Sequence, residues 1–151
     1  MTSETVSLNT LWDEVDFTPN DAQAEAIRHV GGPLYLTAGP GSGKTRVVLW
    51  RTVNLIVRHE VNPDEIFLST FTEKAAQQLR EGLRVLLNVA SGHTGKPYDI
   101  GEMYIGTIHS LCQQLLSDRR FAPNRARDKA PRLLDDLGQY FYLYQKRNWT
   151  D

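Results

Sequence analysis

The stretch Ala38-Gly39-Pro40-Gly41-Ser42-Gly43-Lys44-Thr45 decides the fold that this sequence predicts. It fits the phosphate-loop pattern, except that alanine stands in the place of the first glycine. Glycine-rich backbone lets successive N–H groups surround a phosphate, and a helix that begins near Gly43 adds the positive end of its dipole. Lys44 can reach the terminal phosphates of a nucleotide, and the Thr45 hydroxyl can bind Mg²⁺.

The segments on either side of this loop support the same interpretation. Leu34 to Ala38 is a short apolar run and predicts a buried strand. After the loop, apolar residues recur at helical spacing, namely Val47, Val48, Leu49, Val53, Ile56 and Val57. A glycine-rich turn with an incidental lysine is the alternative, but phosphate loops lie between a strand and a helix, as here. We therefore predict a nucleotide site.

A helix is predicted upstream of the loop. The stretch Thr18-Pro19-Asn20-Asp21 is typical of a helix start, with Thr18 as the cap and Asp21 in the place of a capping-box acid. We expect the helix to end at Gly31-Gly32. Gln23 on this helix carries an amide that matches N6 and N7 of adenine. Such a side chain is also often only solvated, so its chemistry leaves both interpretations open.

A second strand-and-helix unit follows. Ile66 to Thr70 predicts a strand, and the next helix has an apolar stripe formed by Ala75, Ala76, Leu79, Leu83, Leu86 and Leu87. Ser91 to Gly101 is rich in Gly, Pro and polar residues and predicts a loop. Met103 to Thr107 predicts a third strand, followed by a helix through Leu111, Leu115 and Leu116. The alternation of strands and helices indicates an α/β fold with a parallel sheet.

The last part of the chain has a different character. Arg119 to Arg132 is a basic segment, which can contact duplex phosphates or serve as a solvated linker. Beyond it, helical spacing relates Leu133, Leu137, Tyr140, Phe141 and Tyr144. We expect a helix there.

Composition restricts the class of protein. Among 151 residues, 40% are apolar and 23% charged, which is close to the globular average. The single cysteine, Cys112, cannot form an internal disulfide, and we expect it to be a small core residue. The sequence has no signal peptide and no apolar run near the ~18 residues of a membrane span. We expect a cytoplasmic protein without a membrane partner.

Four segments resemble, in order, the motifs of superfamily 1A DNA helicases, the UvrD, Rep and PcrA group. They are Phe17-Thr18-Pro19-Asn20-Asp21-Ala22-Gln23 (Q motif), Ala38 to Arg46 (motif I), Thr70-Phe71-Thr72-Glu73-Lys74-Ala75-Ala76 (motif Ia) and Gly106-Thr107-Ile108-His109-Ser110-Leu111 (motif Ib). Alanine commonly opens the loop in this family. Glu73 and Ile108 depart from the residues that many relatives have at these positions. These departures leave UvrD-like and RecB-like branches open.

The resemblance implies a P-loop NTPase (RecA-like) fold, a parallel sheet flanked by helices. Residues 1–117 would be the N-terminal part of domain 1A, and residues 118–151 a basic linker and the start of helical subdomain 1B. The sheet would be incomplete, and domains 2A and 2B would belong to the remainder of a longer enzyme.

The resemblance also implies ATP and Mg²⁺ as ligands. Gln23 would read adenine, Arg46 would pack on the base, and Lys44 and Thr45 would be the catalytic pair that holds phosphate and Mg²⁺. The full implied nucleotide-binding set is Gln23, Ala38, Gly39, Pro40, Gly41, Ser42, Gly43, Lys44, Thr45 and Arg46.

Single-stranded DNA, or its junction with a duplex, is the implied partner. Phe71, Thr72, Thr107 and His109 match positions that line the DNA channel of the family. An aromatic ring can stack on bases, and Thr and His side chains can donate to phosphates. Residue chemistry alone favours a core position for Phe71 and allows Thr72 simply to cap the helix that begins at Glu73.

The expected function is therefore that of an ATP-dependent DNA helicase or translocase with a role in DNA repair. The 151 residues contain no apolar strand that ends in Asp-Glu, the second acidic site of a P-loop ATPase. We expect this chain alone to be inactive, because that site and the arginine fingers are absent. Alternatives are the helicase part of a RecB-like helicase-nuclease, a non-catalytic nucleotide- or DNA-binding module and, more remotely, a small-molecule kinase.

Overall fold

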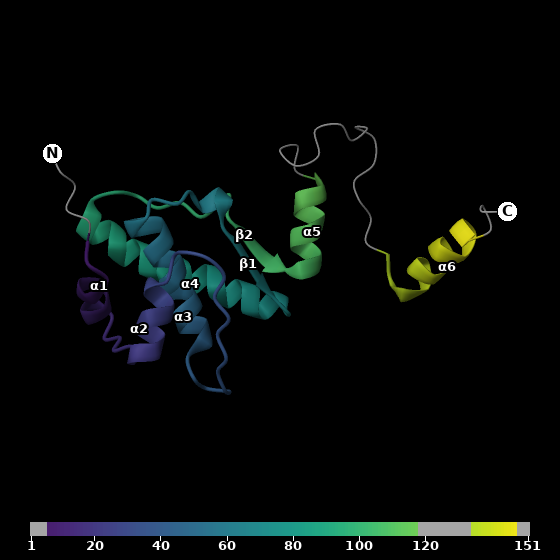
Figure 1. Ribbon diagram of the computed structural model, residues 1–151. Coiled ribbons are helices and arrows are strands. Elements are labelled where there is room, and N and C mark those ends of the chain that lie inside the picture. Colours follow the sequence, from purple (N-terminus) through teal and green to yellow (C-terminus); the bar gives the residue numbers. More distant parts are fainter. Residues whose placement is uncertain (1–5, 118–133, 148–151) are drawn as a thin grey trace. The chain divides into compact units, whose positions relative to one another are not determined.

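The computed structural model describes residues 6–117 and 134–147, and Figure 1 shows the course of their helices and strands. The chain divides into two compact units, residues 1–107 and 108–151. The basic segment predicted at residues 119–132, and Leu133 of the last apolar pattern, lie outside the described residues. A domain boundary after residue 117 stays a prediction.

The first unit begins with two short helices, α1 (Leu8–Glu14) and α2 (Asp21–Arg28). The predicted start of α2 is wrong in detail, because Asn20 rather than Thr18 is the cap. The Asn20 side chain accepts the Gln23 N–H at 2.9 Å, and the Gln23 side chain accepts the Asn20 N–H at 3.0 Å. This reciprocal pair is a capping box that satisfies two backbone donors. The helix ends at Arg28, before the glycines predicted to end it.

The helix after the glycine-rich loop is α3 (Lys44–Val53), which continues as a π-helical turn, η1 (Asn54–Arg58). Four residues of the predicted apolar stripe are buried, namely Val47, Val53, Ile56 and Val57. Val48 is exposed and Leu49 half-buried, whereas Trp50, outside the predicted stripe, is buried. Two polar side chains of α3 and η1 bond to the end of α2. Arg51 donates to the Ala26 carbonyl at 2.8 Å, and buried Asn54 donates to the Ile27 carbonyl at 3.1 Å. These bonds satisfy carbonyls that a helix end leaves unpaired.

The described sheet has two parallel strands, β1 (Phe67–Thr70) and β2 (Tyr104–Thr107), and a 3₁₀ turn, η2 (Pro63–Glu65), precedes β1. The register pairs Phe67 with Tyr104 and Thr70 with Thr107, so both strands end at the same edge. The Phe67 and Tyr104 rings stack with centroids 4.5 Å apart. The strands predicted at residues 66–70 and 103–107 are therefore confirmed.

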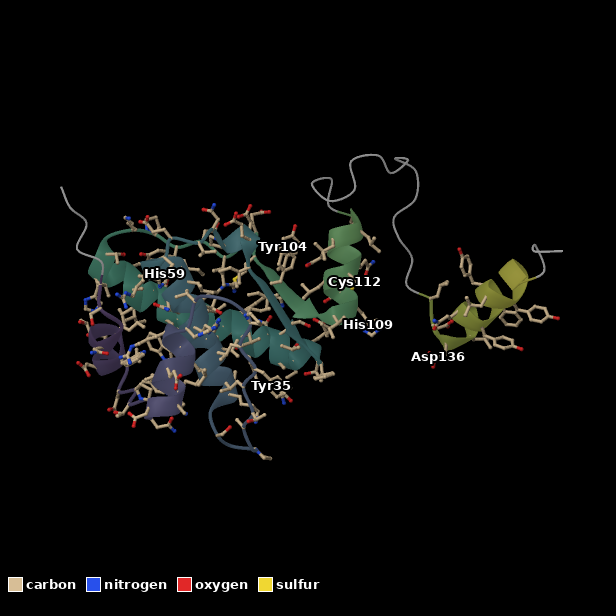
Figure 2. The ribbon with its side chains drawn as sticks, viewed as in Figure 1. Tyr35, His59, Tyr104, His109, Cys112 and Asp136 are labelled. Atoms are coloured by element: carbon tan, nitrogen blue, oxygen red, sulfur yellow. The ribbon has the colours of Figure 1, made fainter. Side chains whose placement is uncertain are left out.

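The buried strand predicted at Leu34 to Ala38 is wrong. This segment has no regular secondary structure, and Tyr35 is 91% exposed (Figure 2). Leu34 and Leu36 are exposed as well. An apolar run becomes a strand only when a neighbouring strand completes its hydrogen-bond ladder, and among the described residues β1 and β2 pair only with each other. The fold is thus mixed α/β with a small parallel sheet, without the strand expected before the loop.

Helix α4 (Glu73–Thr94) packs against β1, β2 and α3, and it occupies the middle of the first unit in Figure 1. Its buried face comprises Ala76, Leu79, Leu83, Leu87 and Ala90. The predicted loop at residues 91–101 begins too early, because the Ser91 and Thr94 hydroxyls donate to carbonyls four residues back, at 2.9 and 3.0 Å. Gly95, with a φ of 66°, ends the helix.

A close contact between α3 and α4 gives a stability prediction. A Cβ on Gly82 would lie 2.8 Å from Leu49 Cδ1, whereas a Cβ on Gly92, also in α4, would meet nothing within 4 Å. Both Gly→Val changes lie in the same helix, Gly82 in its middle and Gly92 in its last turn, and they differ chiefly in the contact with Leu49. We expect Gly82→Val to lower the free energy of unfolding by about 1 kcal/mol more than Gly92→Val, the low end of the cost of overpacking, since the contact is with the end of the flexible Leu49 side chain. Urea unfolding measures this difference, and equal stabilities would refute the close contact.

The described residues of the second unit form two helices, α5 (Ile108–Ser117) and α6 (Asp136–Arg147), as the apolar spacing predicts. The prediction that Cys112 is a core residue is wrong, because Cys112 is exposed and Leu111 is the buried residue of α5. Successive helix residues lie about 100° apart around the axis, so neighbours seldom share a face. Helix α6 exposes Leu137, Tyr140, Phe141, Tyr142, Leu143 and Tyr144. Within residues 6–117 and 134–147, no helix has the length and apolar character needed to cross a membrane.

Candidate nucleotide-binding site

The glycine-rich loop reaches the start of α3 through two glycines with left-handed backbone. Gly41 has a φ of 75° and Gly43 a φ of 80°, values that residues with a side chain seldom adopt. Gly43 occupies the N-cap position of α3, and no side chain caps this helix end. The first N–H groups of α3 are therefore left without the usual side-chain acceptor, an arrangement suited to an anion. The helix starts where the sequence predicts it.

Lys44 folds back over the loop. Its Nζ donates to the Ala38 carbonyl at 2.9 Å and to the Gly39 carbonyl at 2.6 Å. The Ser42 hydroxyl donates to the same Gly39 carbonyl at 2.7 Å. The loop thus holds the ammonium group by its own carbonyls, and Lys44 itself is the first residue of α3. Thr45, the next residue, is exposed.

Gln23 joins α2 to the loop. Besides its bond to Asn20, its Nε2 donates to the Ser42 carbonyl at 3.1 Å. The two residues are far apart in sequence, so this contact sets the distance between the start of α2 and the glycine-rich loop. A cavity of about 130 Å³ lies at this junction, lined by residues that include Gln23, Leu36, Thr37, Ser42 and Lys44.

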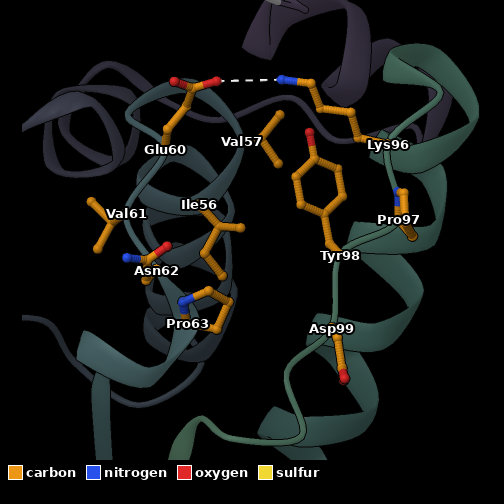
Figure 3. Close-up of a pocket in the computed structure, with 10 residues that line it drawn as sticks. All are labelled: Ile56, Val57, Glu60, Val61, Asn62, Pro63, Lys96, Pro97, Tyr98 and Asp99. Carbon is orange, nitrogen blue, oxygen red and sulfur yellow. Dashed lines mark hydrogen bonds and ion pairs between the residues drawn. The ribbon is translucent and has the colours of Figure 1, made fainter.

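A larger cavity, of about 240 Å³, lies elsewhere in the first unit (Figure 3). It separates the end of η1 from residues 96–99, and none of the loop residues 38–45 lines it. Lys96 Nζ and a Glu60 carboxylate oxygen lie 3.3 Å apart across it. The larger volume therefore does not mark the phosphate site, because the residues of the phosphate-loop motif line the smaller cavity.

Arg46 lies against an aromatic cluster. The Phe17 and Trp50 rings are stacked, with centroids 5.8 Å apart, and Trp12 packs edge-on against both. The Arg46 guanidinium carbon lies 5.0 Å from the centroid of the Phe17 ring. Phe17 is buried while Arg46 is exposed. The cluster therefore supports one side of the guanidinium through a cation–π contact.

Three of the predicted DNA residues lie where the parallel strands end. Phe71 and Thr72 directly follow β1, and Thr107 ends β2 opposite Thr70. Phe71 is 95% exposed, so the core position favoured by residue chemistry is wrong. Thr72 does cap α4, as the alternative proposed, because its hydroxyl accepts the Ala75 N–H at 3.1 Å. Ligands of α/β sheets bind at this carboxyl edge.

The fourth predicted DNA residue, His109, belongs to the second unit. It is exposed on α5, where Figure 2 labels it. Thr107, two residues earlier in the sequence, is half-buried and belongs to the first unit.

Two features of the site escaped sequence reasoning. The first is the capping box of Asn20 and Gln23, whose spacing of three residues is itself a helix-start signal. The second is the bond from Gln23 to the Ser42 carbonyl, for which the sequence carries no local signal.

The fold and the loop define a mixed α/β protein with a phosphate-loop motif at the start of a helix. The profile of the UvrD/REP helicase N-terminal domain matches residues 19–150. The chain therefore belongs to the UvrD/REP helicase family, as the motifs predicted.

Curated relatives agree with this assignment. The chain is 38% identical over 111 residues to the ATP-dependent DNA helicase SRS2 of Saccharomyces cerevisiae, an alignment that covers 73% of this chain and 9% of the yeast protein. It is 38% identical over 100 residues to the ATP-dependent DNA helicase UvrD1 of Mycobacterium leprae, covering 66% of this chain and 12% of that protein. It is 37% identical over 97 residues to the ATP-dependent DNA helicase PcrA of Bacillus subtilis, covering 64% and 12%. The aligned part thus spans about a tenth of the length of these relatives.

Proposed function

We propose that this chain is the N-terminal, ATP-binding part of a DNA helicase that couples ATP hydrolysis to movement on single-stranded DNA. The observation that carries the proposal is the loop at residues 38–45, which leads into a helix with an uncapped N-terminus and carries Lys44 beside it. Family membership and the printed names of the relatives, ATP-dependent DNA helicases, support it. In this proposal residues 1–117 are part of domain 1A, and residues 118–151 begin subdomain 1B.

The loop residues fit the phosphates of a nucleotide. The uncapped N–H groups of α3 are donors without a side-chain acceptor, and phosphate oxygens are strong acceptors. Among the described residues, the partners of Lys44 Nζ are neutral carbonyls, which a phosphate can replace with a larger electrostatic gain. The exposed Thr45 hydroxyl would supply one ligand to Mg²⁺, which usually takes its other ligands from phosphate and water.

The adenine base would lie toward α2. Gln23 lines the smaller cavity, and Arg46 is supported on one side by Phe17 while the guanidinium remains exposed. A planar guanidinium can stack on a base, and a glutamine amide can pair with its edge. These roles follow from the family resemblance and are part of the proposal.

The DNA strand would cross the carboxyl edge of the sheet. There Phe71 presents an exposed ring, and Thr72 and Thr107 lie at the ends of the same two parallel strands. His109, on α5 of the second unit, belongs to the same predicted DNA set only through the family resemblance. Stacking on an aromatic ring and contacts to phosphates give binding that does not depend on base sequence. A role in DNA repair and a cytoplasmic location belong to the same proposal.

Nucleotide binding and turnover by the 151-residue chain test this function. We expect weak binding of Mg·ATP and no hydrolysis stimulated by single-stranded DNA, because the sequence supplies no acidic strand end to orient the attacking water. Calorimetry and a phosphate-release assay measure the two quantities. Turnover of about 1 s⁻¹ or faster, ordinary for enzymes, would contradict the catalytic part of the proposal. Failure to bind Mg·ATP at millimolar concentration would contradict the nucleotide site.

A further inference from the structure

The Gln23 side chain uses both ends of its amide within the protein. Its Oε1 accepts the Asn20 N–H at 3.0 Å, and its Nε2 donates to the Ser42 carbonyl at 3.1 Å. Recognition of adenine by Gln23 would need contacts between the amide and the base, but no bond from the amide to the loop. The structure instead shows a bridge from the first turn of α2 to the middle of the phosphate loop.

We propose that Gln23 is a positioning residue for the phosphate loop, acting on phosphate binding whatever base the ligand carries. This inference rests on the proposed nucleotide site and assigns Gln23 a role beyond adenine recognition. Four features of Gln23 bear on it. They are the capping box that anchors Gln23, its contact with the phosphate loop, the peptide plane that this contact fixes, and the hydrogen-bonding capacity that its amide retains.

The anchor is the capping box. The Asn20 side chain accepts the Gln23 N–H at 2.9 Å while the Gln23 Oε1 accepts the Asn20 N–H, so two bonds hold both the backbone and the side chain of Gln23. The adjoining residues Ala24, Ala26 and Ile27 are buried, which fixes α2 in the core. The amide therefore extends from a rigid support.

The contact falls at the most constrained part of the loop. Ser42 lies between Gly41 and Gly43, both in the left-handed region, and its hydroxyl bonds to the Gly39 carbonyl. Gln23 Nε2 would lie 3.1 Å from a Cβ on Gly43, closer than ordinary van der Waals contact. The glutamine thus packs directly on the loop backbone as well as bonding to it.

The bond to Ser42 determines the direction of a donor in the loop. The Ser42 carbonyl and the Gly43 N–H belong to one planar trans peptide group, in which they point in opposite directions. Fixing the carbonyl toward Gln23 therefore fixes the Gly43 N–H on the other side. Backbone N–H groups at this position of a phosphate loop surround the anion, so a loose peptide plane would weaken binding of any polyphosphate.

The amide keeps capacity for a ligand. A glutamine amide has two N–H donors and an oxygen with two lone pairs, and the structure uses one donor and one lone pair. A base can still take the other donor and the other lone pair. Positioning and base recognition are thus compatible, and experiment can separate them.

The separating probe is inorganic tripolyphosphate with Mg²⁺, which carries phosphates but no base. In the 151-residue chain, Gln23→Met keeps a side chain of similar length without its polar groups. We expect it to weaken tripolyphosphate binding by about threefold to tenfold, the effect of one net hydrogen bond, and to weaken ATP and GTP by at least as much. Calorimetry with the three ligands measures these ratios.

Two further variants test whether weaker tripolyphosphate binding in Gln23→Met is due to loss of the bond to Ser42. Gln77→Met makes the same substitution on α4, where the amide bonds to Glu81 within its own helix, and it should leave tripolyphosphate affinity unchanged. Asn20→Ala removes one half of the capping box and leaves the bond to Ser42 available. If Asn20→Ala weakens tripolyphosphate as much as Gln23→Met does, the start of α2 is responsible and the inference is wrong.

The outcomes distinguish this inference from the proposed function. Unchanged tripolyphosphate affinity in Gln23→Met, with a lower preference for ATP over GTP, would make Gln23 an adenine reader only and leave the nucleotide site intact. If the wild type binds none of the three ligands, the nucleotide site fails and the role of Gln23 in phosphate binding fails with it. Hydrogen exchange in the ligand-free chain tests the structural part of the inference, namely that Gln23 orders the loop. The Ser42 and Val47 amides donate to loop carbonyls, and we expect both to exchange faster in Gln23→Met but not in Gln77→Met. Equal exchange rates would overturn it.

Discussion

Lys44→Ala is expected to lower the affinity of the chain for Mg·ATP by about 100-fold or more, since bonds to charged groups contribute about 1.5–3 kcal/mol each. It should also abolish hydrolysis in any longer protein that contains this chain. Lys44 Nζ already lies at the loop, within 2.9 Å of two carbonyls, so it needs little movement to reach a phosphate. Removing it leaves the phosphates without their main cation.

Lys96→Ala is the matched control for this variant. It removes the same charge from the first unit, at the larger cavity, where Lys96 pairs with Glu60 on the surface. An exposed ion pair contributes little to stability, and we expect ATP affinity to stay at the wild-type value. Calorimetry on both variants, with circular dichroism to verify folding, measures the effect. Wild-type ATP affinity in Lys44→Ala would show that the loop is not a phosphate site.

Phe71→Ala is expected to weaken binding of single-stranded DNA by about 1–3 kcal/mol, the contribution of stacking one base on an aromatic ring. Because Phe71 is 95% exposed, its removal should not change the free energy of unfolding. Fluorescence anisotropy with labelled oligonucleotides of different sequence measures the affinity. Binding should weaken steeply as salt rises, since phosphate contacts release counterions, and it should not depend on base sequence.

Val85→Ala provides the comparison for Phe71→Ala. Val85 is also an exposed apolar residue associated with α4, but it lies along the helix rather than at the end of β1. We expect DNA affinity in this variant to equal that of the wild type. Equal loss in both variants would indicate non-specific contact with apolar surface, and no loss in Phe71→Ala would remove this ring from the DNA site.

The elements that the sequence predicts well are those whose signals are local. The apolar stripe of α4 repeats at helical spacing over many turns, and the short runs that became β1 and β2 are rich in β-prone residues. The run from Leu34 to Ala38 carries an equally clear local signal but needs a partner strand, which no spacing within the run can reveal. Strand formation there depends on contacts distant in sequence.

In the candidate site, too, the features with local sequence signals are predicted and those that depend on distant contacts are not. The loop glycines and Lys44 follow from the motif, because each has a defined task at a defined position. The predicted start of α2 is two residues early, since Thr18 and Asn20 both offer a capping oxygen and only Asn20 has a partner glutamine three residues on. The exposure of Phe71 depends on how the chain turns after β1. The bond from Gln23 to Ser42 depends on the packing of α2 against α3.

The exposed run Leu34–Leu36 has a colloidal consequence. It is an apolar segment with Tyr35 almost fully exposed, and it pairs with no strand within the part of the chain that the structure describes. A segment of this kind is a template on which a strand from another chain can pair. We therefore expect the time for which a solution of this chain remains monodisperse to depend on protein concentration as well as on temperature. The same run also gives an incoming strand a place to add without disturbing the buried core.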